Sequence, residues 1–152
     1  MRLPRFISRL ILPLAFLLTP ATTVAANDSA SRYVMVAMPP PDINSISINE
    51  ARSIFSMRVY RWPDGSPITV FVLPDDSHAH QTFIRNQLGL LPRQLKRNWE
   101  RMVYTGIGKA PQVVANEEQM LKELLATPGA VGYVNADVLD GKGAQLHAIT
   151  LQ

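Results

Sequence analysis

The feature that most constrains the fold is the apolar run at 68–73 (ITVFVL), which is rich in β-branched and aromatic side chains. Turn residues at 62–67 (WPDGSP) precede it, and Pro74 ends it before a helix expected at about 77–88. Such a run is typical of a strand covered on both faces. Where a strand leads into a helix in an α/β sheet, free backbone N–H groups favour anions. The segment therefore predicts where a ligand would bind.

The first 26 residues are typical of a secretory signal peptide. They begin with three arginines and no acid, continue with a short apolar run at 10–18, and end with small residues at 23–26. A membrane anchor is the alternative, but it needs about 20 apolar residues, and prolines leave this run shorter. We expect cleavage after Ala25 or Ala26, which leaves a periplasmic or secreted domain at 27–152 without a transmembrane helix.

Charge and cysteine content exclude several classes of function. Three of the 15 basic residues lie in the leader, so the remaining chain has 12 basic and 12 acidic residues. This balance argues against nucleic acid as a partner, although the excess of bases at 50–109 predicts one basic face. The chain has no cysteine, which excludes thiol catalysis and thiolate metal sites.

Periodicity predicts one α/β domain. Besides the run at 68–73, strands are expected at 33–37, 112–115, 130–134 and about 144–151. Helices are expected at about 47–57, 77–88, 92–103 and 117–127. Gly89 is expected to end the second helix, Val103 to belong to the apolar stripe of the third, and Asn116 to cap the fourth. Ser47 and Glu50 have the spacing of a capping box, and Trp62, Phe83 and Trp99 are expected in the core. The alternation predicts a mixed sheet of about five strands with helices on both faces.

Several short motifs carry a resemblance to a known family. They are ARSIF at 51–55, WPDGSPI at 62–68, Phe83, Trp99 followed by YTG at 104–106, and PGAVGYV at 128–134. In their order and spacing they resemble the small phosphate-type substrate-binding domains of ABC transport systems. The resemblance covers about 33–150 and implies a single lobe of the type 2 periplasmic-binding-protein-like fold. It also implies a non-catalytic role, with a small oxyanion such as phosphate as the ligand.

The resemblance places the ligand site at the junction between strand and helix. Phosphate-binding relatives have Arg-x-x-x-Ser-Gly-Thr there, whereas this chain has LPDDSHA at 73–79 and keeps only Ser77. Ser77, its neighbours Asp76 and His78, and Thr105 of the TGIGK loop are the predicted ligand-binding residues. Asp75 and Asp76 add negative charge beside the expected anion, and this repulsion opposes the attraction of the helix terminus.

Two other features invite a functional interpretation. Asp75, Asp76, His78 and His80 are metal-ligating residue types, but residues two apart on a helix point to nearly opposite sides. The alternative, which we adopt, is that Asp76 or Ser77 caps the helix and the histidines are solvated, so no metal or other cofactor is predicted.

The second feature is a basic face on the helix at 92–103. Its members are Arg93, Lys96, Arg97 and Arg101. It is either a solvated helix face or an interaction surface for a periplasmic or membrane protein. No catalytic motif is present, so the two hypotheses are a weak oxyanion-binding domain and an interaction module that keeps the fold without a ligand.

Overall fold

The computed structural model describes residues 33–38, 43–106, 109–139 and 146–152. Six strands form one sheet in the order β2-β6-β1-β5-β3-β4. Their bounds are β1 Tyr33–Ala37, β2 Ser45–Ile46, β3 Thr69–Val72, β4 Gln112–Val113, β5 Ala130–Asn135 and β6 His147–Leu151. The sheet is mixed, because β1 is antiparallel to β5 and β6 while β3 is parallel to β5 and β4. The predicted α/β class and mixed sheet are confirmed.

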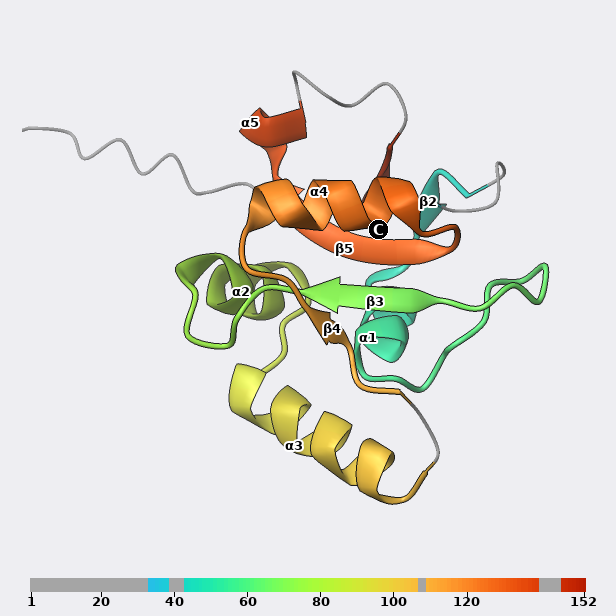
Figure 1. Ribbon diagram of the computed structural model, residues 1–152, viewed down its shortest axis with the longest axis vertical. Coiled ribbons are helices and arrows are strands. Elements are labelled where there is room, and N and C mark those ends of the chain that lie inside the picture. Colours follow the sequence, from blue (N-terminus) through green and yellow to red (C-terminus); the bar gives the residue numbers. More distant parts are fainter. Residues whose placement is uncertain (1–32, 39–42, 107–108, 140–145) are drawn as a thin grey trace, which may run out of the picture.

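Helices cover both faces of the sheet, as the sequence predicts (Figure 1). On β5, Tyr133 packs against Phe55 of α1 (Ile48–Phe55) and stacks on Phe83 with ring centroids 4.1 Å apart. The neighbouring Gly132 faces the opposite side, where a Cβ would meet side chains of α4 (Glu117–Ala126). Alternate residues of β5 therefore face different helical layers.

The described sheet has six strands, one more than the five segments expected from the sequence, and the additional strand is β2. β2 is only two residues long and pairs in parallel with the end of β6, where Ser45 lies opposite Thr150. It has no apolar alternation to detect, because Ser45 is exposed and Ile46 alone is buried. The expected strand at 112–115 is also shorter, with only Gln112–Val113 in the ladder.

Helix α1 begins and ends with recognisable local signals. The predicted capping box is confirmed, since the Ser47 side chain accepts from the Glu50 N–H and the Glu50 carboxylate accepts from the Ser47 N–H. At the other end, the Met57 N–H donates to Ile54 and the Arg58 N–H donates to Ser53. These two bonds form a Schellman motif, in which Met57 takes the left-handed position at φ 62°.

The helix expected at about 77–88 has two parts. An α-helical turn, α2 (His78–Thr82), leads directly into a π-helical turn, η1 (Phe83–Gln87). The wider turn is marked by a bond from the Leu88 N–H to the Phe83 carbonyl. One extra residue in a turn does not alter a short apolar pattern, which explains why the sequence does not reveal it. Gly89, at φ 59°, ends the segment as predicted.

Helix α3 (Pro92–Tyr104) packs on the C-terminal end of α1. The Trp99 indole donates to the Phe55 carbonyl at 2.7 Å, and the Asn98 amide donates to the Ser56 carbonyl at 2.7 Å. These bonds satisfy carbonyls that the end of α1 leaves free. Trp62, Phe83 and Trp99 are buried as predicted, but Val103, which was expected in the buried stripe of α3, is 45% exposed.

The last two helices in the described residues are α4 and α5. Asn116 caps α4 by accepting from the Gln119 N–H, as predicted, and the short helix α5 (Ala136–Leu139) was not predicted. No helix in the described ranges has the length and apolar character needed to cross a membrane. The predicted signal peptide at 1–26 and the start of the domain at 27 lie outside the described residues, as does the expected beginning of the last strand at 144.

Candidate functional site

The candidate site is the junction between β3 and α2. After β3 the chain turns through Pro74 and Asp75, and the Ser77 N–H donates to the Pro74 carbonyl at 2.9 Å. The Ser77 hydroxyl then accepts from the His80 N–H at 3.1 Å, so Ser77 is the N-cap of α2. Of the two caps considered from the sequence, the structure selects Ser77. A capping hydroxyl that accepts this bond keeps its own proton for another acceptor.

His80 is buried, which contradicts the expectation that both histidines are solvated. Its side chain is 1% exposed, and its Nδ1 lies 2.7 Å from the hydroxyl of Tyr133. That hydroxyl also accepts from the Leu73 N–H at 2.9 Å, so it joins His80 to the end of β3. Burial lowers the pKa of His80, while the nearby Asp75 opposes this shift.

Asp75 links this buried pair to the surface. One carboxylate oxygen lies 3.9 Å from His80 Nε2, and the other lies 2.6 Å from the Lys96 ammonium on α3. The bond to Asp75 raises the pKa of Lys96. Much of the charge that was expected to repel an anion is thus neutralised by a lysine from another helix.

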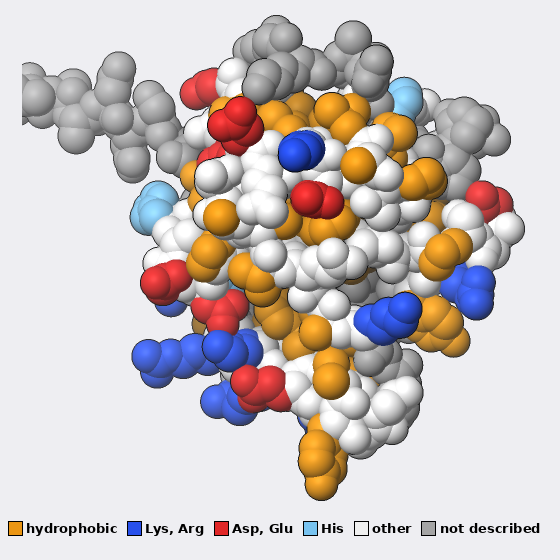
Figure 2. All heavy atoms as spheres, in the orientation of Figure 1, with side chains coloured by type: hydrophobic (Ala, Val, Ile, Leu, Met, Phe, Trp, Pro, Cys, Tyr) orange, Lys and Arg blue, Asp and Glu red, His pale blue; other side chains and the backbone are white. Residues whose placement is uncertain are grey.

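The predicted basic face borders a groove of about 670 Å³ at this junction. Arg93, Lys96 and Arg97 of α3 line one side, and Arg85 of η1 joins them. Asp75 and Asp76 line the same groove. Figure 2 shows blue basic and red acidic side chains close together over this end of α3. The groove therefore has mixed charge with an excess of arginine.

The structure does not bring all predicted residues together. Asp76 and His78 are exposed at the start of α2, and His78 lies 3.5 Å from the Thr82 hydroxyl. Arg101 is also exposed, and it donates to Asn98 on its own helix. Thr105 follows the other end of α3, nine residues or about 13 Å of helix from Lys96. Its hydroxyl donates to the Arg101 and Met102 carbonyls, so it acts locally.

Sequence reasoning missed two residues of this site, Arg85 and Tyr133. Arg85 stands alone in an otherwise neutral helix, so only the packing of α3 shows that it lines the same groove as Arg93 and Arg97. In the sequence, Tyr133 is an ordinary residue of a buried strand. Its hydroxyl lies within hydrogen-bond distance of His80 because β5 lies next to β3.

The arrangement suits binding better than chemistry. Within the described ranges, no group of three His, Asp or Glu residues is placed to hold a metal ion. The buried histidine faces Tyr133 and Trp99 and has 1% exposure, so it cannot reach a substrate. The groups that line the groove include three arginine side chains, which bind oxyanions through planar paired donors.

Comparison with solved structures identifies the fold. The chain is similar to a putative phosphate ABC transporter substrate-binding protein with bound phosphate from Clostridium perfringens (TM-score 0.61, 14% identity, covering 78% of this chain and 44% of that one). It is also similar to a possible phosphate binding protein from Planctomyces limnophilus (0.58, 13%, 79% and 41%). A third similar structure is an ABC-type phosphate transport receptor from Vibrio cholerae (0.58, 13%, 78% and 45%).

These similarities show a phosphate-binding-protein-like α/β fold, which the sequence motifs predict. The chain spans less than half the length of each of these three proteins. No protein-family model matches the chain, and no curated protein matches it in sequence.

Proposed function

We propose that this chain is a non-catalytic, periplasmic or secreted domain that binds a small oxyanion such as phosphate weakly in the groove between α2 and α3. The observation that carries the proposal is that Arg85, Arg93 and Arg97 line one groove with Asp75 and Asp76, which follow the carboxyl end of β3. Ligands of open α/β sheets bind at such strand ends. The similarity to solved phosphate-binding proteins supports the same class of ligand.

The charges of the groove favour weak binding rather than none. At about 4 Å and surface-like dielectric, one unit charge attracts or repels another by about 4 kcal/mol before screening. Lys96 is already paired with Asp75, and exposed Asp76 offsets part of the attraction from the three arginines. The Ser77 hydroxyl, next to Asp76 at the start of α2, would add one donor. A groove open to water gains less affinity than an enclosed cleft, so we expect a millimolar dissociation constant.

Calorimetry with phosphate and sulfate tests this proposal. The unmodified chain should release or absorb heat in a saturable titration, and Arg93→Gln with Arg97→Gln should weaken the binding about tenfold or more. Arg58→Gln is the matched control, because Arg58 is exposed at the end of α1 and does not line the groove. No heat at millimolar anion, with an unchanged melting temperature, would reject oxyanion binding.

The second candidate is an interaction module that keeps the fold without a small ligand. The observation that favours it is an apolar surface beside the basic face. Tyr104 is 93% exposed and Val113 66% exposed, and both line a cavity of about 490 Å³ between α3 and β4. Tyrosine and arginine together are common at the centre of protein interfaces. The partner would be a periplasmic or membrane protein with an acidic patch.

Charge reversal separates the two candidates. If the surface binds a protein, Arg93→Glu with Arg97→Glu should abolish a complex that forms with the unmodified chain, and Tyr104→Ala should weaken it. Ser77→Ala should leave that complex intact, whereas oxyanion binding should lose one donor and weaken. A complex that survives all three changes would exclude this surface.

Export is a separate part of the proposal, and it rests on the leader described from the sequence. N-terminal sequencing of the protein recovered from the periplasm or medium should find a chain that begins at Ala26 or Asn27. Recovery of the intact N-terminus from the membrane fraction would favour an anchor instead.

A further inference from the structure

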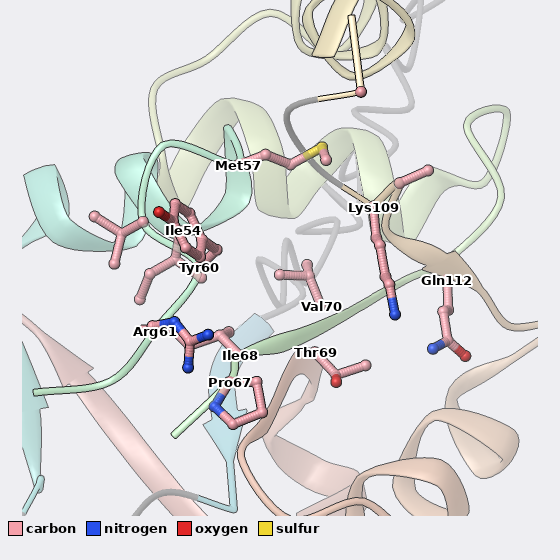
Figure 3. A pocket seen from close by; sticks show the side chains of 13 residues that line it. Ile54, Met57, Tyr60, Arg61, Pro67, Ile68, Thr69, Val70, Lys109 and Gln112 are labelled. Atoms are coloured by element: carbon pink, nitrogen blue, oxygen red, sulfur yellow. The ribbon is translucent and has the colours of Figure 1, made fainter. Parts of the chain in front are cut away.

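A third cavity lies at the opposite end of β3 from the arginine groove. It has a volume of about 530 Å³, within the range of about 300–1,000 Å³ that is usual for small-molecule sites. Its walls come from the end of α1, the segment that leads into β3, and the residues that precede β4 (Figure 3). Thr69 and Val70, the first residues of β3, form part of its wall.

The cavity exists because β3 and β4 pair over only two residues. Phe71 lies opposite Gln112 and Val72 opposite Val113. Thr69 and Val70 pair with β5 on the other side, but no described residue pairs with them on the β4 side. The chain before Gln112 runs away from β3, and Lys109 lies across the gap that this leaves.

The lining combines an apolar wall with two cations and no acid. Ile54, Met57 and Val70 supply apolar surface, and Arg61 and Lys109 supply positive charge. Figure 3 shows the Arg61 guanidinium and the Lys109 amine on either side of Val70. Within the described residues, neither cation has a carboxylate within ion-pair distance. The groove and the cavity described above both contain acidic residues, whereas this cavity has only cationic charged side chains among the described residues.

Local backbone structure positions one cation, Arg61, and one apolar residue, Met57, in the cavity wall. Arg61 donates through Nη1 to the Gly65 carbonyl at 2.8 Å, which holds the guanidinium beside the cavity while other donors remain available. Met57 occupies the left-handed position of the α1 C-cap, where glycine is usual. A side chain at this position is strained, and here it is buried against the core and forms part of the cavity wall.

We propose that this cavity binds a small amphipathic anion, namely a carboxylate on an apolar body. The carboxylate would accept from Arg61 and Lys109, while the apolar body would cover Ile54, Met57 and Val70. An inorganic oxyanion could not use the apolar wall, so this site differs in ligand class from the arginine groove. The inference goes beyond the proposed function and does not depend on it.

Binding of phenylbutyrate and phenylbutanol, followed by amide NMR of the ¹⁵N-labelled chain, tests the proposal. The two probes share an aromatic body and differ in the carboxylate. Phenylbutyrate should shift the amide signals of Val59, Thr69 and Gln112 saturably. Phenylbutanol should bind about tenfold more weakly, because it lacks the charge-assisted hydrogen bonds.

Substitutions locate the carboxylate. Lys109→Gln should weaken phenylbutyrate binding severalfold and leave phenylbutanol unchanged. Lys122→Gln is the matched control, because Lys122 is an exposed residue of α4 on the other face of the sheet. Arg61→Gln should act like Lys109→Gln. Amide signals of the turn at Gly65 that do not change in this variant would show that the turn is intact.

Four results would overturn the proposal. They are the absence of saturable shifts at millimolar phenylbutyrate, equal affinity for the alcohol, equal weakening by Lys122→Gln, and shifts confined to the arginine groove. A titration with inorganic phosphate is a further test of the ligand class. If phosphate moves the same amide signals with comparable affinity, the apolar wall contributes nothing and the assigned ligand class is wrong.

Discussion

The hydroxyl of Tyr133 lies 2.7 Å from Nδ1 of His80, and both side chains are buried. Tyr133 belongs to β5 and His80 to α2, so this hydrogen bond joins the sheet to the helix that follows β3. Because the same hydroxyl accepts from the Leu73 N–H, it also holds the end of β3 against β5. One phenol thus fixes the position of the candidate site.

Tyr133→Phe should lower the free energy of unfolding by about 2–4 kcal/mol, because it leaves the Leu73 N–H and His80 Nδ1 buried without a partner. Urea denaturation measures the loss. Tyr104→Phe is the control, since Tyr104 is 93% exposed and its substitution should change stability by less than about 0.5 kcal/mol. Equal effects of the two substitutions would show that the buried hydroxyl is unimportant.

Stability should decrease as the pH falls below about 6.5, the ordinary pKa of histidine. Burial lowers the pKa of folded His80, so the unfolded chain takes up this proton more readily, and acid favours unfolding until the pH is below the folded value. The groups that face His80 are Tyr133, Trp99 and Asp75, and Asp75 is paired with Lys96. Asp75 reduces the shift without reversing it.

Urea titrations at about pH 7.5 and about pH 5.5 measure this dependence. His80→Gln should have a smaller difference between the two conditions than the unmodified chain, although it is less stable at both. His78→Gln should retain the full difference, because His78 is exposed. A difference that persists in His80→Gln would assign the effect to other groups.

Gly129→Ala should destabilise the fold more than Gly65→Ala, although both glycines have positive φ, at 76° and 86°. Each substitution strains the backbone by about 1–2 kcal/mol. At Gly129 the new Cβ would also collide with the Pro67 carbonyl oxygen, whereas at Gly65 nothing lies within 4 Å. Thermal or urea unfolding of the pair isolates the cost of the collision, and equal losses would contradict this packing.

Trp99→Phe should destabilise the contact between α3 and α1 by about 1–3 kcal/mol, because the buried Phe55 carbonyl loses its donor. Asn98→Ala should have a smaller effect, since the Ser56 carbonyl is only partly buried. Hydrogen exchange of α3 amides should increase in both variants while the amides of β5 stay protected. A uniform increase in amide hydrogen exchange across the whole chain would show that α3 does not unfold separately.

Predictions from the sequence are confirmed for features that depend on one short segment of the chain. The Ser47 capping box, the Asn116 cap and the glycine that ends the segment at Gly89 depend on backbone groups a few residues away. The run at 68–73 likewise yields a strand, β3, which lies between β5 and the edge strand β4. These outcomes follow from hydrogen bonds and torsion angles within one stretch of chain.

The environment of His80 required the tertiary structure. The two-residue spacing correctly predicts that His78 and His80 point to different sides of the helix. It does not show which of them faces β5. Burial of His80 depends on Tyr133, which lies 53 residues later in the chain. The pairing of Asp75 with Lys96 likewise depends on how α3 packs against α1 through Trp99.

The sequence by itself determined the α/β class, most of the strands and helices, and the junction at 73–77 as the place where a strand leads into a helix. It could do so because these features depend on local periodicity and capping. The tertiary structure decided which charges meet at that junction and where the cavities lie. The groove that Arg85 shares with α3, the hydrogen bond between Tyr133 and His80, and the cavity that Lys109 shares with the start of β3 form only when distant segments pack together.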